Sequence, residues 1–398
     1  MQGYPDEGGA TDAPEATVGS GGFSAAISAQ SSSLGQDGNG SGGSRHGSTA
    51  ESEQRSEGVY GALDLGTNNC RLLLARPSRR GFRVVDAFSR IIRLGEGVSQ
   101  SGRLSEPAMS RTLDALKVCA TKLGRAKVRR SRLVATEACR VAANGREFLD
   151  RVHDKLGLEI EILTPELEAR LAVSGSAALI DASCDYVLVF DIGGGSSELI
   201  LLDLTRRGRH RDRRSGGRLD AQNCMVAWTS LPIGVVTLAE RFGGRHVAPH
   251  DFEAMVAETQ RMLVAFEGQH KLSERLAGRR MHMLGTSGTV TTVAGIQLGL
   301  KRYDRNRVDG CWHNVDDVRG VTVDLLGRSY DQRVAEPCIG RDRADLVLAG
   351  CAILEAILRM WPCERLRVAD RGLREGILTT LMLEDGVFGP VRRRRRPV

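Results

Sequence analysis

A run of glycines between two carboxylates is the part of this chain best suited to chemistry. The polar residues of this stretch are, in order, Asp191, Gly193, Gly194, Gly195, Ser196 and Glu198. Apolar runs lie on both sides, which is the pattern of two strands joined by a turn. Glycines accept positive φ and leave backbone N–H groups open, and such groups can form a concave anion site. A hairpin turn without a ligand is the alternative, but it requires only one or two glycines.

A second stretch repeats this arrangement nearer the N-terminus. An apolar run from Val59 ends in Asp64, and another begins at Arg71. Between the runs lies a turn that contains the candidate phosphate-binding residues Gly66, Thr67 and Asn68. Such residues tolerate turn conformations and offer hydrogen bonds. Two hairpins of this kind predict duplicated α/β domains that face each other, with the anion in the cleft between their tips.

A third candidate for anion binding is the start of a predicted helix. An apolar strand ends at Gly285, and Ser287 and Gly288 then open the helix. The free N–H groups of a helix N-terminus favour anions. The alternative is a helix that is well capped and binds nothing.

The carboxylates Asp64, Asp191 and Glu198 would repel a phosphate unless a cation lies between them. Mg²⁺ prefers one or two carboxylates together with phosphate oxygens and water. The acids therefore predict a phosphoryl transfer assisted by Mg²⁺ or another divalent cation. Arg140 could clamp the phosphate in a bidentate manner.

An attacking water also needs a base, and one helix offers two candidates. Thr164 and Pro165 form a clear helix start, and Glu166 and Glu168 lie in the first turns of that helix. A carboxylate at this place could orient a water or simply interact with the helix dipole. The residues themselves do not choose between Glu166 and Glu168.

Composition limits the remaining possibilities. Residues 1–57 are rich in Gly and Ser and acidic, which predicts a disordered tail, and no run has the length of a membrane span. Nine cysteines without a C-x-x-C pair favour a reducing, cytoplasmic location. The chain carries a net charge of +7, which favours a polyanionic partner or simply an Arg-rich surface. Arginines gather in residues 205–222 and 392–396, which we interpret as a solvated loop and tail, or as contacts for RNA or a long polyanion.

Taken together, the motifs resemble the exopolyphosphatase / guanosine pentaphosphate phosphohydrolase family, within the superfold shared by actin, sugar kinases and heat-shock chaperones. The matching stretches, in order, are ALDLGTNNCRLLLA, ATEACRVAANG, TPELEARLAVSG, VFDIGGGSSELI, SLPIGVVTLAERF, LGTSGTV, RADLVLAG and DRGLREGIL. The resemblance implies two RNase H-like α/β domains with the active site in the cleft between them. It implies that Glu168 is the catalytic base, that Arg140 clamps phosphate, and that Asp191 and Glu198 are associated with the metal.

The chain departs from the family in four respects. Asn69 stands where the family often has a hydroxyl, and Glu137 and Cys139 are unusual beside Arg140. The Arg-rich insertion at 205–222 is not part of the family core. The chain ends near the end of the two-domain core, without the helical HD-type extension of longer members, so the resemblance does not imply processive cleavage.

We therefore expect a tail over 1–57, domain I over 58–180, domain II over 181–385 with its last helix packing back on domain I, and a basic tail over 386–398. The expected function is an exopolyphosphatase that releases terminal orthophosphate from polyphosphate. The alternatives are a pppGpp 5′-phosphohydrolase, a regulator that binds (p)ppGpp or polyphosphate without cleaving it, a kinase of the same superfold, and an RNA-binding protein. A homodimer is the assembly considered, and no membrane contact is expected.

Overall fold

The computed structural model describes residues 58–78, 81–209 and 221–388. The tail predicted over 1–57, most of the Arg-rich insertion and the arginines at 392–396 lie outside the described residues. Short 3₁₀ turns, η2 (Leu204–Arg209) and η4 (Ala221–Cys224), stand at the two described ends of the insertion.

The first sheet is built around a strand that is buried along nearly its whole length. The sheet has the order β3-β2-β1-β4-β5. Its strands are β1 (Tyr60–Leu65), β2 (Asn69–Ser78), β3 (Gly81–Ile91), β4 (Arg130–Ala135) and β5 (Glu161–Ile162). β1, β2 and β3 form an antiparallel meander, whereas β4 runs parallel to β1 and β5 parallel to β4. The helices next along the chain are α2 (Val98–Ser101), α3 (Glu106–Arg125), α4 (Glu137–Val141) and α5 (Gly145–Leu156).

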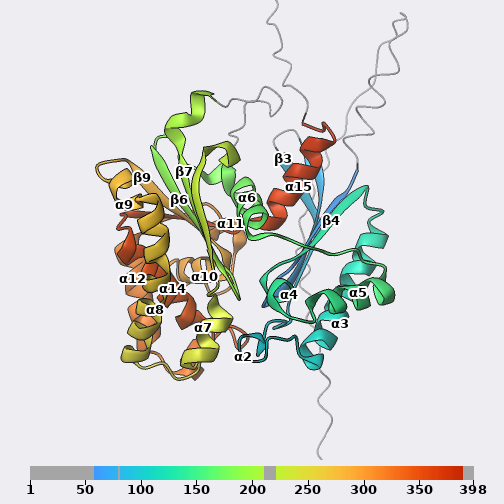
Figure 1. Ribbon diagram of the computed structural model, residues 1–398, viewed down its shortest axis with the longest axis horizontal. Coiled ribbons are helices and arrows are strands. Elements are labelled where there is room, and N and C mark those ends of the chain that lie inside the picture. The colour runs from blue at the N-terminus through green and yellow to red at the C-terminus, as the bar shows by residue number, and fades with distance from the viewer. Residues whose placement is uncertain (1–57, 79–80, 210–220, 389–398) are drawn as a thin grey trace, which may run out of the picture. The chain divides into compact units, whose positions relative to one another are not determined.

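The second sheet repeats this topology and adds one edge strand. Its order is β10-β11-β9-β6-β7-β8, with β6, β7 and β8 antiparallel and β9 and β11 parallel to β6 (Figure 1). The strands are β6 (Tyr186–Ile192), β7 (Ser197–Asp203), β8 (Met225–Leu231), β9 (Met281–Thr286), β10 (Trp312–Asn314) and β11 (Arg365–Ala369). Two sheets that each consist of an antiparallel meander followed by parallel strands confirm the predicted α/β class with two RNase H-like halves.

The remaining helices follow the sequence signals closely in most places. They are α6 (Pro165–Ser176), the 3₁₀ turn η1 (Ala177–Leu179), α7 (Val235–Phe242), α8 (Pro249–His270), α9 (Leu272–Leu276), α10 (Ser287–Gln297), α11 (Arg305–Val308), α12 (Val315–Gly327), α13 (Tyr330–Ala335), α14 (Val347–Met360) and α15 (Leu373–Glu384). Thr164 caps α6 through a side-chain bond to Leu167 N–H, as its sequence predicted. No helix among the described residues is long and apolar enough to cross a membrane.

Residues 300–342 contain elements that were not predicted from the sequence. β10, α11 and α13 are too short to show an apolar period, since each covers fewer than two helical turns or only three strand residues. For α12, however, the signal was present. Asn314 caps the helix, and Val315, Val318 and Leu325 are buried at helical spacing.

The last helix, α15, packs against the first sheet although it follows the last strand of the second. Ile377 and Leu378 share a core with Tyr60 and Leu73 of the first sheet. α15 also lies directly on α6, and a Cβ added at Gly376 would stand 2.0 Å from the carbonyl oxygen of Leu171. The helix that carries Glu168 is therefore fixed by backbone contact with α15. The division into 58–180 and 181–385 stays a prediction.

Candidate active site

The two hairpins correspond residue by residue. In the first, Asp64 stands directly opposite Arg71, and in the second, Asp191 stands directly opposite Glu198. The turns close in the same way: Gly66 N–H donates to the carbonyl of Asn69, and Gly193 N–H donates to the carbonyl of Ser196, both at 2.9 Å. Opposite residues of an antiparallel pair share one face. Each hairpin therefore presents an Asp and a second ionisable group on the same face beside its turn.

The tips of the two hairpins touch each other. A Cβ added at Gly194 would lie 2.9 Å from the Cβ of Thr67, and one at Gly195 would lie 2.9 Å from the Thr67 hydroxyl. Behind the second tip, Gly234 at the start of α7 is so close that its Cβ would stand 2.4 Å from the carbonyl carbon of Gly194. These glycines are thus required for close approach as well as for open N–H groups, a reason that the sequence alone did not reveal.

A cavity of about 140 Å³ lies where the tips meet, and both sheets contribute to its lining. Of the residues predicted from the sequence, the lining includes Asp64, Gly66, Thr67, Asn68, Glu168, Asp191, Gly193, Gly194, Gly195, Ser196, Glu198, Ser287 and Gly288. Arg140 is the predicted site residue that does not line it. The cavity is smaller than the roughly 300–1,000 Å³ of pockets that enclose drug-sized ligands. It has the size for one end of a substrate.

Three polar atoms in this lining are buried without a partner. They are the side-chain oxygens of Asn68, Asn69 and Ser287. Ser287 also has a φ of 89°, a left-handed conformation that is costly for a residue other than glycine. Buried polar groups are normally hydrogen-bonded, and backbone strain concentrates at functional sites. Both features indicate that a polar ligand belongs here.

The three acids predicted to bind a cation are shielded from solvent and close enough to repel one another. Burial, followed by the nearby Asp191 carboxylate, raises the pKa of Glu198 to about 7. Burial also raises the pKa of Asp191 and of Asp64, although the Thr286 hydroxyl opposes the rise for Asp191 and Arg71 opposes it for Asp64. In the described part of the chain no group of three His, Cys, Asp or Glu side chains forms a ready metal cage. The arrangement instead fits Mg²⁺, which takes one or two carboxylates and completes its shell with phosphate and water.

Glu168 enters the cavity from the first turn of α6 and is held by Arg140. The Arg140 guanidinium donates to Glu168 Oε2 at 3.1 Å, to Glu137 Oε2 at 2.5 Å and to the Leu163 carbonyl at 2.7 Å. Burial, followed by repulsion from Glu198, raises the pKa of Glu168 well above its usual value, and Arg140 opposes that rise. The phosphate-clamping role of Arg140 stays a prediction, because its guanidinium is engaged by these carboxylates.

Glu166, the other candidate base, points elsewhere. Its carboxylate accepts from Arg170 one turn later at 3.0 Å, on the exposed side of α6. It does not line the cavity, whereas Glu168 does. Residues on successive turns of one helix face the same side only at spacings of three or four, so Glu166 and Glu168 diverge.

Sequence reasoning missed three charged residues in the lining, namely Arg71, Glu137 and Arg343. Arg71 could have been found, because the repeat of the hairpin places it at the position of Glu198. Arg343 has no motif of its own: it precedes α14, and only the tertiary fold brings it next to Gly288, 3.7 Å from a Cβ added there.

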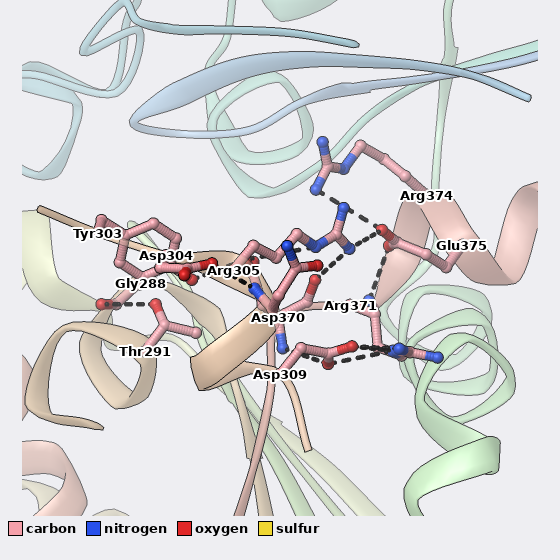
Figure 2. A network of polar contacts seen from close by, with 12 residues as sticks. Gly288, Thr291, Tyr303, Asp304, Arg305, Asp309, Asp370, Arg371, Arg374 and Glu375 are labelled. Atoms are coloured by element: carbon pink, nitrogen blue, oxygen red, sulfur yellow. Dashed lines mark hydrogen bonds and ion pairs between the residues drawn. The ribbon is translucent and has the colours of Figure 1, made fainter. Parts of the chain in front are cut away.

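The start of α15 is tied to the second sheet by a polar network (Figure 2). The carboxylate of Glu375 accepts from Arg305 and from the Gly372 N–H, each at 2.9 Å, and Arg371 pairs with Asp309. Burial would raise the pKa of Glu375, but Arg374 and Arg305 outweigh it and leave the pKa below its usual value. Because α15 also packs on α6, this network helps to fix the position of Glu168.

Replacing Glu375 with Gln should destabilise the protein by about 2–3 kcal/mol, because a buried charge pair loses one partner and the other is left uncompensated. The Glu375 side chain is only 6% exposed. The free energy of unfolding, measured by urea denaturation, checks this. Glu384→Gln is the matched control, since its exposed pair with Arg130 is worth less than about 1 kcal/mol. Equal effects of the two changes would contradict the role given to Glu375.

Comparison with known proteins gives a consistent result. A model of the Ppx/GppA phosphatase family matches residues 74–385. An exopolyphosphatase 2 of Mycobacterium tuberculosis is 29% identical over 338 residues, which are 80% of this chain and 97% of the relative. A guanosine-5′-triphosphate,3′-diphosphate pyrophosphatase of Photobacterium profundum is 28% identical over 336 residues. That alignment covers 81% of this chain but spans only 59% of the relative.

Solved structures have the same fold. The crystal structure of the Aquifex aeolicus member of the Ppx/GppA family superposes with a TM-score of 0.65 at 28% identity, over 82% of this chain and 98% of that one. An exopolyphosphatase structure from Cytophaga hutchinsonii gives a TM-score of 0.70 at 24% identity, over 81% and 97% of the two chains, which shows a common fold.

Proposed function

Because this chain belongs to the Ppx/GppA phosphatase family, we propose that it hydrolyses the terminal phosphoanhydride bond of inorganic polyphosphate and releases orthophosphate. The observation that carries the proposal is the cavity between the hairpin tips. It combines open backbone N–H groups, three unpartnered polar atoms and a carboxylate of raised pKa in a space suited to one phosphate group.

In the proposed reaction Glu168 takes a proton from a water whose oxygen attacks the terminal phosphorus. The new P–O bond forms as the bridging P–O bond breaks, and the shortened chain leaves with the bonding electrons. The N–H groups of Gly193, Gly194 and Gly195, with the Thr67–Asn68 turn, hold the terminal phosphate. Such groups stabilise developing charge without reorganising.

Asp191 and Glu198, with Asp64 beside them, would hold the divalent cation. Bound there, Mg²⁺ would neutralise charge on the phosphate oxygens. Arg140 would orient Glu168 and, once released from Glu137, could clamp phosphate as predicted from the sequence.

A pppGpp 5′-phosphohydrolase is the second candidate, supported by the name of the Photobacterium profundum relative. pppGpp ends in the same kind of anhydride, so the chemistry at the cavity would be unchanged. The residues that line the cavity include no aromatic ring on which a guanine could stack, which favours polyphosphate. Homodimer formation and a cytoplasmic location stay predictions.

The test is orthophosphate release from long-chain polyphosphate and from pppGpp, measured in parallel with Mg²⁺ and after chelation. We expect release from polyphosphate without ATP, its loss on chelation and its recovery when Mg²⁺ is returned. Faster release from pppGpp would establish the second candidate instead. Binding of either compound without any release would leave a regulatory binding protein.

A further inference from the structure

A second concave surface adjoins the cavity on the side of the first sheet. It is a groove of about 650 Å³ lined by the end of β3, by Arg93 and Arg111, and by Asp342 and Arg343 in front of α14. Arg343 lines both the groove and the cavity. One guanidinium therefore stands at the junction between the site of the terminal phosphate and the groove.

The floor of the groove is continuous with the first phosphate hairpin. The N–H groups of Ile92 and Arg93 donate to the carbonyl of Asn68 at 2.9 and 3.1 Å. The N–H of Gly95 donates to the carbonyl of Thr67 at 2.9 Å. Arg93 has a φ of 47°, an uncommon left-handed conformation at a bulky residue. The same turn that lines the cavity is thus bonded to the segment that lines the groove.

The groove carries more positive than negative charge, and part of that charge is available. Four arginines face two carboxylates, Glu96 and Asp342. Arg93 is engaged by Asp345 at 2.9 Å, and Arg111 by Glu96 at 2.9 Å. Arg90 and Arg343 form no ion pair with any described residue, and Arg90 lies only against the ring of Phe88. A ligand of this groove would meet two uncommitted guanidinium groups.

We propose that this groove binds the phosphates of polyphosphate that follow the one being cleaved, with Arg343 at the junction and Arg90 farther along. The inference rests on the proposed function and extends it to the length of the substrate. The cavity encloses only one end of a substrate, so the remainder must leave it, and Arg343 marks the side of exit. The lining of the groove offers guanidinium groups and no aromatic ring, which suits a chain of phosphates and not a base.

The test compares three substrates that differ in their reach, namely long-chain polyphosphate, tripolyphosphate and pppGpp. Arg90→Glu should raise the KM for long-chain polyphosphate about tenfold or more, the effect of losing a charge-assisted contact. The KM for tripolyphosphate should change by less than about twofold, because a surface charge beyond a Debye length is screened. Arg83→Glu is the matched control, since Arg83 is an exposed residue at the far end of the same strand.

Three results would overturn the proposal: an unchanged KM for the long chain, an equal rise for tripolyphosphate, or an equal rise in Arg83→Glu. A rise confined to pppGpp would assign the groove to the nucleotide and overturn the polymer interpretation as well. Failure of the proposed function looks different, because tripolyphosphate would then not be cleaved by the unaltered protein. In that case equilibrium binding of long-chain polyphosphate decides: weaker binding by Arg90→Glu than by Arg83→Glu supports the groove, and equal binding overturns it.

Discussion

Glu168→Gln is expected to lower kcat for orthophosphate release by about 10²–10⁴-fold, the usual contribution of a positioned general base. Gln keeps the size and the hydrogen bond that Glu168 Oε2 accepts from Arg140, but it cannot take a proton. Substrate contacts by the hairpin tips are unaffected, so the KM should change little. Initial rates over a range of polyphosphate concentrations separate the two parameters.

The pH dependence of the unaltered protein provides a second measurement of the same group. Burial and the Glu198 carboxylate raise the pKa of Glu168 well above its usual value. A base acts only when deprotonated, so kcat/KM should fall as the pH drops through this raised pKa and level off above it. The acidic limb should therefore lie above the range of an ordinary glutamate, and the residual activity of Glu168→Gln should lack it.

Glu166→Gln is the matched control, on the same turn of α6. It removes only the exposed pair with Arg170, worth about 0.3–0.5 kcal/mol, and should leave kcat unchanged. Thermal unfolding of both variants shows whether they are folded. Substantial activity in a folded Glu168→Gln protein would remove Glu168 from the mechanism.

Gly376→Ala is expected to destabilise the protein by about 3 kcal/mol or more, at the upper end of the cost of overpacking. The new Cβ would stand 2.0 Å from the Leu171 carbonyl, which belongs to the backbone of α6 and cannot move aside alone. Separation of α6 from α15 would displace Glu168, so activity should fall in the molecules that remain folded. Chemical denaturation measures the first effect and rates at low temperature measure the second.

Gly268→Ala separates crowding from helix propensity. Gly268 lies within α8, and a Cβ added there meets nothing within 4 Å. Since Ala is favoured over Gly in a helix by about 0.5–1 kcal/mol, this change should stabilise the protein. If Gly376→Ala also left stability unchanged or raised it, the close contact between α6 and α15 would not exist in solution.

The repeated hairpins show how far local sequence reaches. Asp191 and Glu198 lie seven residues apart on two strands joined by a glycine turn, and Asp64 and Arg71 have the same spacing. The antiparallel register follows from such a turn, so the sequence alone is enough to predict these pairs. Local signals also predict α6, because Thr164 and Pro165 start it.

The choice between Glu166 and Glu168 was not local. The residues alone left it open, and a family resemblance favoured Glu168. In the fold the direction of each side chain around α6 places Glu168 in the cavity and Glu166 at the surface. That direction depends on the face of α6 that packs against α15 and the second sheet.

The sequence by itself determined the α/β class, the two hairpins and the acids beside their turns, because these depend on contacts between residues close along the chain. Only the tertiary structure decided that the hairpin tips touch, that α15 returns to the first sheet, and that Arg343 joins the cavity to a basic groove. These features depend on surfaces that meet over long separations in the chain, for which no local pattern exists. The glycines of the second hairpin belong to both groups: their turn is local, whereas the close approach of Thr67 to Gly194 is not.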